Sequence, residues 1–467
     1  MPELPLTTGN YGRSRSDLPQ TKLVNAYIEV SPGGPQQTIR TTRPGLTRQY
    51  TVGQGPILAI YQNPGVFLGD VFTVSGSELY RNTTLLGTIS YSTCPQFAYA
   101  NGYLCLVSGG ALYVYDGTTL TTQTLYDDGV SPLPPFSGIS VLYNVFILPL
   151  TGTNKFLYTS VGNPTSINAL DLSVAEVFPD LIVQTYVLAE ELYIFKNDTT
   201  EIWDYTGELN SPFQEAPGRT YQRGCANQAS VQRLDNGLFW IADNFSVYRS
   251  GATPDKVSTP FIDVKLRDLG DTISEVTALT CNIEGHMFYV LNIPSLGESY
   301  AYDTQTGEWA RWGTQLPAKF EPGIFLGSCA AGQGNYIYTG SAVDGRVFKF
   351  DPNVHTDDGT DIQVVVSGAV WTMGGVQRCN NISLHCVRGV GDALAIDPIV
   401  RVRWSDDGGR TWTTFKNAFL GRKGAYYYKA IWRGLGLIQQ PGRLFEFYIS
   451  DPVNVTIEGA SINEMRP

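Results

Sequence analysis

The sequence predicts an all-β protein, a β-propeller of six or seven blades with an additional small β-sandwich or platform domain. The composition favours this class, because the 467 residues include 49 Gly and 27 Pro, with 12% aromatic and only 16% charged residues. Such a mixture suits many short strands joined by tight turns. Strand-like runs rich in aromatic and β-branched residues also recur along most of the chain, at intervals typical of propeller blades.

The clearest copy of the recurring unit is residues 285–312, GHMFYVLNIPSLGESYAYDTQTGEWARW. It reads as three strands in succession, at 286–292, at 299–303 and around Trp309, separated by a Pro/Gly break and a Thr-Gly turn. A unit of this kind has one apolar face that it cannot bury alone. Copies of it must therefore pack on one another.

An aromatic residue on the second strand of each copy measures the length of the repeat. Its gaps are 33, 45, 45, 45, 52 and 48 residues, and blades of about 40–50 residues are expected in propellers. A succession of ordinary hairpins stays open as the alternative, although three equal gaps argue against it. The aromatic residues are Tyr80, Tyr113, Tyr158, Trp203, Tyr248, Tyr300 and Phe348.

Residues 1–50 are predicted to form an extended arm that docks on the protein's own body or on a neighbour. They contain one strand-like run at 23–30 and few acidic residues. Residues 51–356 carry the repeat and are predicted to form the propeller. The basic residues of the arm are Arg13, Arg15, Lys22, Arg40, Arg43 and Arg48.

Residues 357–467 are predicted to form the sandwich-like platform domain. The polar stretch HTDDGTDIQ begins at His355, and the strand-like runs beyond it no longer follow the blade layout. Helix is expected only at 262–274, where apolar residues follow a three- and four-residue spacing. These apolar residues are Ile262, Leu266, Leu269 and Ile273.

The formal net charge of −11 is unevenly distributed, because residues 1–356 contain 20 Lys and Arg against 32 Asp and Glu. An acidic body argues against a protein that grips nucleic acid by neutralising phosphates. Ordinary solubility is the plainer explanation of the same charge. The seven cysteines contain no CxxC motif, which predicts free thiols in a protein made in a reducing cytoplasm. No apolar run approaches the length of a membrane span.

The sharpest local motif is an Asp-box, S-x-D-x-G-x-T-W, formed by Ser405, Asp407, Gly409, Thr411 and Trp412. It predicts a hairpin turn in which the aspartate accepts backbone N–H bonds and the glycine supplies a positive φ. The motif resembles the Asp-boxes of sialidases. A sialidase also needs an arginine cluster, a Tyr–Glu nucleophile pair and an acid, and it usually repeats the box, whereas this chain has one copy.

No catalytic, cofactor-binding or metal-binding residues are predicted, and the protein is not expected to be an enzyme. Adjacent carboxylates at 127–128, 190–191 and 357–358 point to opposite faces of a strand and are expected to be solvated turn residues. The three histidines are isolated in the sequence. The string at 426–433, YYYKAIWR, is expected to alternate core and surface, with stacking on nucleic-acid bases as the alternative.

Several short sequence stretches, spread over the chain, resemble those of the tail-hub, or nozzle, family of short-tailed bacteriophages (podoviruses), also called packaged DNA stabilisation proteins. They are NAYIEVSPGG from Asn25, TRPGL from Thr42, PDKVSTPFID from Pro254, YAYDTQTGEWARW from Tyr300, WSDDGGRTW from Trp404, WRGLG from Trp432 and SDPVNVTIEGA from Ser450. The single Asp-box and the short first gap depart from the family's pattern and leave the number of blades open.

The resemblance implies a structural virion protein, made in the host cytoplasm and located in the tail. It implies a homo-oligomeric ring, usually a hexamer, below the portal and adaptor proteins. This ring closes the DNA channel, retains packaged DNA until genome ejection and supports tail fibres, spikes or a needle. DNA is expected to pass without sequence-specific binding, and the residues that contact DNA or partners are unknown. The alternatives are a carbohydrate-binding or glycan-cleaving propeller, and a cytoplasmic scaffold propeller.

Overall fold

The computed structural model describes residues 3–12, 20–30, 38–208, 211–317, 319–333, 336–371, 375–391, 394–440 and 442–463. Arg13 and Arg15 of the expected arm lie outside these residues. The chain divides into two units. The propeller unit comprises Arg48–Ser295 and Gly327–Lys349, and the sandwich unit comprises Met1–Thr47, Leu296–Leu326 and Phe350–Pro467.

The described residues of the propeller unit form seven successive antiparallel modules, of which the first five are four-stranded sheets built from consecutive strands. The first two modules are β6 (Ile57–Tyr61), β7 (Phe72–Ser75), β8 (Glu78–Arg81) and β9 (Thr84–Thr88), then β10 (Gln96–Ala100), β11 (Tyr103–Ser108), β12 (Ala111–Tyr115) and β13 (Leu120–Gln123). The third and fourth are β14 (Ser140–Leu142), β15 (Val145–Pro149), β16 (Lys155–Tyr158) and β17 (Leu172–Val174), then β18 (Ile182–Leu188), β19 (Glu191–Lys196), β20 (Thr200–Tyr205) and β21 (Phe213–Tyr221).

The last three modules differ in size. The fifth is β22 (Gln232–Leu234), β23 (Gly237–Ile241), β24 (Val247–Arg249) and β25 (Asp255–Lys256). The sixth is the hairpin β26 (Thr277–Ile283) and β27 (His286–Ile293), after which the chain passes into the sandwich unit at Leu296. The seventh is β30 (Gly327–Gln333), β31 (Tyr336–Ser341) and β32 (Arg346–Asp351), beside β5 (Gly45–Thr51).

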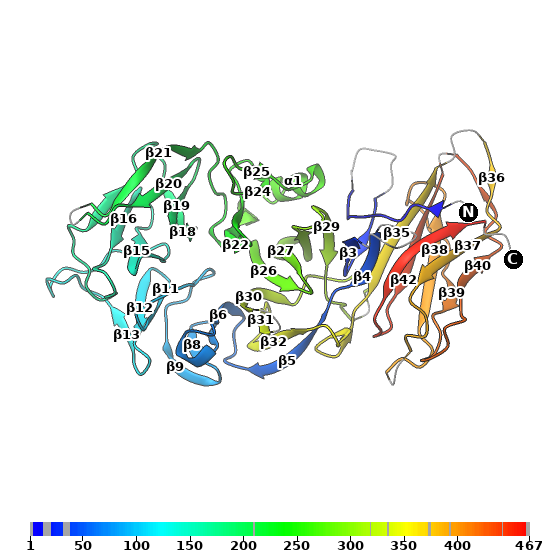
Figure 1. Cartoon of the computed structure of the whole chain (residues 1–467), viewed down its shortest axis with the longest axis horizontal. Helices are drawn as coiled ribbons and strands as arrows, with labels where there is room; N and C mark the ends of the chain where they lie inside the picture. The colour runs from blue at the N-terminus through cyan, green and yellow to red at the C-terminus, as the bar shows by residue number, and fades with distance from the viewer. Residues whose placement is uncertain are drawn as a thin grey trace. The chain divides into compact units, whose positions relative to one another are not determined.

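Neighbouring modules share apolar cores, and the last module returns to the first. Figure 1 shows the modules following one another from blue through green to yellow. The core that closes the ring contains Val52, Ile57 and Val347, and the backbone N of Val52 donates to the carbonyl of Gly345 at 2.8 Å. The N-terminal end of the unit therefore packs against the last module and is hydrogen-bonded to it. This arrangement confirms the prediction of an all-β propeller, with seven modules.

The repeating aromatic residues lie at one equivalent position, on β8, β12, β16, β20, β24, β28 (Glu298–Asp303) and β32. Each is on the third strand of its series rather than the second, because one further strand precedes the hairpin that the sequence pattern shows. Three of them donate a side-chain hydrogen bond to a glutamate two residues earlier, on the same face of the strand. These pairs are Tyr80 with Glu78 at 2.7 Å, Trp203 with Glu201 at 3.0 Å and Tyr300 with Glu298 at 2.8 Å.

The helix expected at 262–274 is shorter than predicted. The α-helix α1 is Pro260–Arg267, and a 3-10 helix, Gly270–Glu275, follows it. Gly270 has a φ of +55°, which ends the α-helical geometry between the two. Three further 3-10 turns are η1 (Phe67–Gly69), η2 (Gln228–Ser230) and η4 (Pro294–Leu296).

The sandwich unit contains two larger sheets. One has the order β3 (Ala26–Val30), β4 (Thr38–Thr42), β43 (Thr456–Ile462), β37 (Asn381–Cys386) and β40 (Ala430–Arg433), with β1 (Glu3–Leu4) also paired to β43. The strand order of the other sheet, within this unit, is β28, β29 (Trp309–Trp312), β2 (Leu23–Val24), β35 (Val364–Trp371), β42 (Gly442–Ile449), β38 (Ile399–Ser405) and β39 (Lys416–Phe419). Short pairs are β33 (Thr356–Asp357) with β34 (Thr360–Asp361), and β36 (Gln377–Arg378) with β41 (Leu437–Ile438).

The two sheets pack against each other, since the rings of Trp432 on β40 and Phe447 on β42 lie 5.8 Å apart. The N-terminal segment joins both sheets. Leu4 pairs with Ala460 of one sheet, and Leu6 forms a bridge to Gly368 of the other. The described residues at the start of the chain therefore pair with strands of the same unit.

The two units group the chain differently from the expected consecutive segments 1–50, 51–356 and 357–467. The first segment shares a unit with the last, and Leu296–Leu326 joins them. The reason is the pairing of β2, which runs parallel to β29 and antiparallel to β35. Strand pairing between segments so distant in the chain leaves no signal in a local pattern.

Candidate functional site

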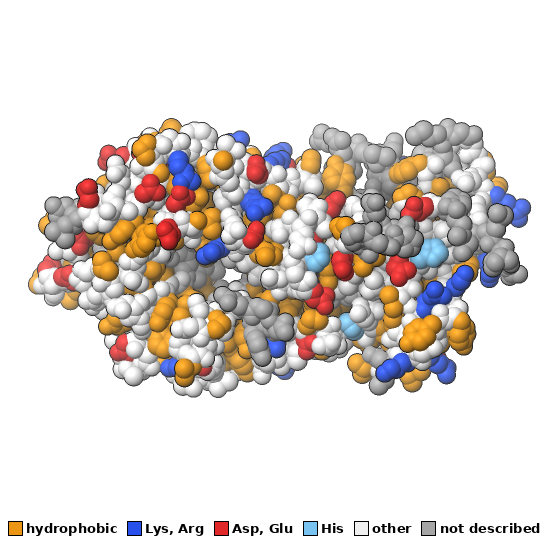
Figure 2. Space-filling model, in the orientation of Figure 1, with side chains coloured by type: hydrophobic (Ala, Val, Ile, Leu, Met, Phe, Trp, Pro, Cys, Tyr) orange, Lys and Arg blue, Asp and Glu red, His pale blue; other side chains and the backbone are white. Residues whose placement is uncertain are grey.

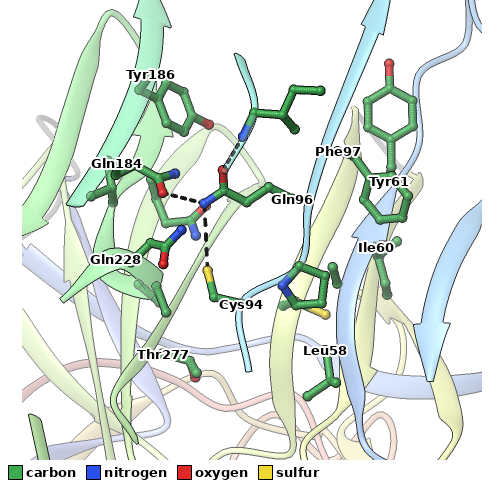
Figure 3. A pocket seen from close by; sticks show the side chains of 18 of the residues that line it. Leu58, Ile60, Tyr61, Cys94, Gln96, Phe97, Gln184, Tyr186, Gln228 and Thr277 are labelled. Carbon is green, nitrogen blue, oxygen red and sulfur yellow. Dashed lines mark hydrogen bonds between the residues drawn. The ribbon is translucent and has the colours of Figure 1, made fainter. Parts of the chain in front are cut away.

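A cavity of about 410 Å³ lies at the centre of the propeller unit (Figure 3). Every module contributes to its wall, mostly through its first strand. The described lining residues are apolar, aromatic, hydroxyl, thiol or amide, and none of them is charged. They are residues 57–61, 93–98, 139–141, 184–187, 228–229, 231–232, 277–278 and 328–330.

Three glutamine side chains from different modules meet at this cavity (Figure 3). Gln96 of β10 donates from Nε2 to Oε1 of Gln184 on β18, and its own Oε1 accepts a bond from the backbone N of Ile139 at 3.1 Å. Gln228 of η2 donates from Nε2 to the carbonyl of Ser137. Because Gln96 and Gln184 belong to the second and fourth modules, their bond reaches across the third.

The titratable groups of the cavity are held in their neutral forms. Burial raises the pKa of the Cys94 thiol to about 11 and that of Cys329 to about 11, although hydrogen bonds lower each in part. Burial and the neighbouring Tyr99 raise the pKa of Tyr61 to about 12. At neutral pH the cavity therefore presents hydrogen-bonding groups and no anion.

The Asp-box follows β38 and forms a closed hydrogen-bonded turn. Ser405 Oγ donates to Asp407 Oδ1 at 2.6 Å and accepts from the backbone N of Gly409 at 2.8 Å. Asp407 accepts from the backbone N of Thr411 at 2.9 Å and from its hydroxyl at 2.5 Å. The indole Nε1 of Trp412 donates to the carbonyl of Gly409 at 3.0 Å, and Gly409 has a φ of +94°.

These bonds favour the charged form of Asp407. Hydrogen bonds from the Ser405 and Thr411 hydroxyls hold the pKa of this carboxyl well below its ordinary value of 3.8. The adjacent Asp406 turns the other way and accepts from Nε and Nη2 of Arg443 at 2.6 and 2.8 Å. The box therefore ties the β38 turn to β42, and its polar atoms are used within the turn.

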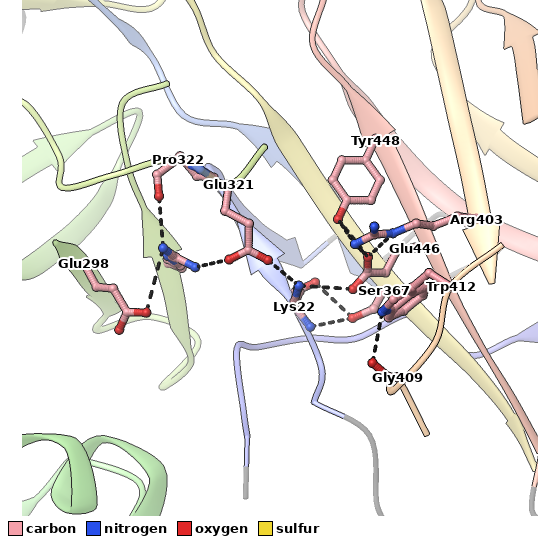
Figure 4. A network of polar contacts seen from close by, with 11 residues as sticks. Lys22, Glu298, Glu321, Pro322, Ser367, Arg403, Gly409, Trp412, Glu446 and Tyr448 are labelled. Atoms are coloured by element: carbon pink, nitrogen blue, oxygen red, sulfur yellow. Dashed lines mark hydrogen bonds and ion pairs between the residues drawn. The ribbon is translucent and has the colours of Figure 1, made fainter. Parts of the chain in front are cut away.

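A buried carboxylate organises the central sheet of the sandwich unit (Figure 4). The side chain of Glu446 on β42 is 0% exposed, and its Oε2 accepts from Nε and Nη2 of Arg403 at 2.8 and 2.6 Å. The hydroxyl of Tyr448 donates to the same oxygen at 2.7 Å. The guanidinium of Arg403 also lies 4.5 Å from the ring centroid of Trp412, which connects this group to the Asp-box.

Lys22 brings the N-terminal segment into this network (Figure 4). Its Nζ lies 2.8 Å from Glu321 Oε1 and 3.4 Å from Glu446 Oε1. Nη1 of Arg311 lies 2.9 Å from the other oxygen of Glu321. Burial acts to raise the pKa of Glu321, but the bond to Lys22 and the charges of Lys22 and Arg311 outweigh it, and the pKa is lowered.

A second buried ion pair lies in the same unit, between Arg43 and Asp357. Both side chains are almost fully buried, and the two N–O distances are 2.9 and 2.6 Å. Nε of Arg43 also donates to Oδ1 of Asn25 at 3.0 Å, and its Nη2 donates to the carbonyl of Gly313 at 3.1 Å. The sequence pattern indicates a solvated turn at Asp357. This prediction is wrong, because the carboxylate is buried and forms an ion pair with the buried guanidinium of Arg43.

The other adjacent carboxylates serve turns and surface pairs. Asp128 accepts from the backbone N of Val130 and Ser131 at 2.9 and 2.8 Å. Glu191 forms an ion pair with Arg219. Among the described residues, no group of three or more His, Cys, Asp or Glu side chains could hold a metal ion. Within the same residues, no helix has the length and apolarity needed to cross a membrane.

The 426–433 string divides into two parts. Ala430 and Trp432 on β40 are buried while Arg433 is exposed, so this half alternates as expected. Residues 426–429 precede the strand and are all exposed, including Tyr427 at 79%. Figure 2 shows Lys and Arg side chains gathered over β36, β37, β39 and β40. The exposed basic residues in this part of the chain include Arg378, Arg388, Arg422, Lys423, Lys429 and Arg433.

Charge follows the division into units. The propeller unit contains 24 Asp and Glu against 13 Lys and Arg, whereas the sandwich unit contains 19 of each. Of the excess of 12 acidic residues counted in residues 1–356, 11 therefore belong to the propeller unit.

A family model described as "Bacteriophage P22 Gp10, beta-propeller" (Phage_stabilise) matches residues 2–354. No curated protein matches the chain. Among solved structures, the computationally designed Ika8 protein has a TM-score of 0.39 at 12% identity, covering 71% of this chain and 100% of that chain. YCF48 from Cyanidioschyzon merolae has a TM-score of 0.39 at 12% identity, covering 67% and 99%.

Proposed function

Because the chain belongs to the bacteriophage P22 Gp10 β-propeller family, we propose that it is the tail hub, or nozzle, of a short-tailed phage. In this proposal a homo-oligomer, expected to be a hexamer, lies below the portal and adaptor proteins and closes the DNA channel. It retains the packaged genome and supports fibres, spikes or a needle during ejection. The protein is then located in the virion tail after synthesis in the host cytoplasm.

The observation that carries the proposal, beyond family membership, is the segregation of charge. All of the excess negative charge lies in the propeller unit, with 24 acidic against 13 basic residues. Each basic contact to a phosphate adds a salt-sensitive increment to DNA affinity, and a wall rich in such contacts would hold DNA by adhesion. An acidic propeller surface repels the backbone instead, so that DNA could slide past it once a constriction opens.

The cavity within the propeller does not suit a DNA conduit. Its volume is about 410 Å³, and the hydrogen-bonded pair Gln96 and Gln184 forms part of its wall. The major groove of double-stranded DNA alone is about 12 Å wide. A channel for the genome therefore has to be lined by several copies of the chain, which is why the proposal requires an oligomer.

The chemistry of the same cavity favours a structural role over catalysis. General acid–base catalysis needs a group whose pKa lies near the working pH. The described lining has no carboxylate, histidine, lysine or arginine, and the pKa values of Cys94 and Cys329 are about 11. A sialidase-like reaction also lacks its arginine cluster in this wall, and the Asp-box lies in the sandwich unit.

The proposal is tested by assembly. The full-length chain, purified alone and then mixed with the portal–adaptor complex of its phage, should add a ring with an axial opening that negative-stain images resolve. The same preparation should not retard double-stranded DNA at low salt. A chain that stays monomeric beside the intact portal–adaptor complex, or a ring whose opening is lined mostly by Lys and Arg, would contradict the proposal.

A further inference from the structure

The central cavity of the propeller unit has the features of a ligand site that the tail-hub role does not use. We propose that it binds a neutral carbohydrate, a hexose or N-acetylhexosamine unit. The volume of about 410 Å³ lies within the range of roughly 300–1,000 Å³ that is typical of small-molecule pockets. All seven modules supply its wall, so the site is fixed by the ring rather than by one loop.

The absence of charge from the described lining selects for a neutral ligand. A charged group that leaves water for a pocket without a counter-ion loses solvation that nothing replaces. The wall offers Gln, Ser, Thr and Tyr side chains and neutral thiols. Anionic sugars such as sialic acid and uronic acids are therefore disfavoured, and so are amino sugars that carry a free ammonium group.

The polar side of the cavity matches hydroxyl groups. A sugar hydroxyl both donates and accepts, and a glutamine amide offers the same pair of functions. Gln96, Gln184 and Gln228 lie close together in Figure 3, and Gln232 adds a fourth, half-exposed amide to the wall. Additional donors and acceptors come from the backbone, since β6, β10, β14, β18, β26 and β30 are end strands of their sheets and contribute residues to the wall.

The opposite side of the cavity is apolar and aromatic. The half-buried rings of Tyr61 and Phe97 lie 5.8 Å apart, and Figure 3 places them with Leu58 and Ile60 away from the amide group. A pyranose ring has an apolar C–H face and a hydroxyl rim, which need these two kinds of wall. An amide cluster facing an aromatic pair thus fits a sugar better than it fits a hydrocarbon or an ion.

The proposal is tested by titrating the full-length chain with glucose, galactose and N-acetylglucosamine, followed by calorimetry or saturation-transfer NMR. At least one neutral sugar should bind saturably and at least tenfold more tightly than glucuronic acid or glucosamine. Absence of saturable binding by all three neutral sugars, or equal binding of glucuronic acid, would overturn the proposal.

A matched pair of variants locates the binding. Gln232→Glu introduces a carboxylate into the cavity wall, and Gln214→Glu introduces the same group at an exposed position of β21. The first should weaken sugar binding at least tenfold and the second should leave it unchanged, with equal melting temperatures showing that both fold. If Gln232→Glu folds and binds the sugar as the wild type does, the site lies elsewhere and the proposal fails. Neither result depends on ring assembly, so the tail-hub role is judged separately.

Discussion

In the propeller unit, apart from the pairing of β32 with β5, strands that are neighbours in a sheet are also neighbours in the chain, whereas the central sheet of the sandwich unit joins distant segments. The strands β10 to β13 pair in sequence order within residues 96–123. In the sandwich unit, Val24 pairs with both Arg311 and Val365. Local pairing repeats a readable period, while long-range pairing depends on side chains that meet only after the chain has folded.

The buried cations of the two units show the same difference. Lys196 in the propeller unit lies 2.6 Å from Glu201 and 2.7 Å from Asp180, all within one module and the loop before it. Arg43 in the sandwich unit holds Asp357, which is 314 residues away. Both cations are 0% exposed, so each carries a comparable cost of desolvation. They differ in the segments that they connect: Lys196 connects parts of one module, whereas Arg43 connects two segments that are distant in the chain.

The largest expected effect comes from Arg43→Met. Removing one partner of a buried ion pair leaves Asp357 charged and without a counter-ion, which costs about 3–5 kcal/mol. The loss should fall on the sandwich unit, and hydrogen-exchange mass spectrometry can compare peptides from the two units. Lys196→Met is the matched variant and should accelerate exchange in the propeller unit instead.

The double variant Arg43→Met/Asp357→Leu separates the charge from the packing. It removes both ions together, so it should recover much of the stability that Arg43→Met loses. If Arg43→Met accelerates exchange equally in both units, the two do not respond separately and the comparison between them is wrong.

A smaller effect is expected from Leu4→Ala. Leu4 is 0% exposed in a two-residue strand at the start of the chain. Truncating a buried leucine costs about 2–5 kcal/mol, through lost burial and the cavity left behind. Leu192→Ala at an equally buried position of β19 is the control in the propeller unit. Urea unfolding followed by peptide-resolved exchange should show the first variant weakening β43 and β35, and the second leaving them unchanged. A neutral result for Leu4→Ala would mean that the N-terminal segment is dispensable for the sandwich.

The same difference between local and long-range strand pairing determines which parts of the fold can be predicted from the sequence. The spaced aromatic residues reveal the propeller because each lies on one equivalent strand. Two of the first strands, β14 and β22, have only three residues, which are too few to show a period. The sandwich strands are visible individually, and their pairing is not. Asp357 illustrates the limit, because its burial depends on Arg43, a residue with no local relation to it.

The cavity glutamines cannot be identified from local sequence patterns for a related reason, since no motif connects residues in different modules. A signal is nevertheless present. Gln96, Gln184, Gln228 and Gln232 each precede the repeating aromatic residue of their module by 16–20 positions. Aligning the modules on that aromatic residue places these amides at the start of the second, fourth and fifth modules, where the cavity is lined.

The smallest expected effect concerns pH, and it separates the exposed ion pairs of the sandwich unit from its buried ones. The folded-state pKa of Glu321 lies below its ordinary value of 4.5, so protonation disfavours the folded form. Its contribution is present above pH 4.5 and is lost as the pH falls through the folded pKa. Because the side chain is 48% exposed, solvent screening limits this contribution to below about 1 kcal/mol.

Glu321→Gln should therefore lower the urea midpoint slightly at pH 7, and the difference from wild type should shrink below pH 4.5. Glu29→Gln, at an exposed position of β3, should show no such pH dependence. A difference that persists unchanged at low pH would assign the effect of Glu321 to packing, and would leave the buried groups around Glu446 to hold Lys22 and the N-terminal segment in place.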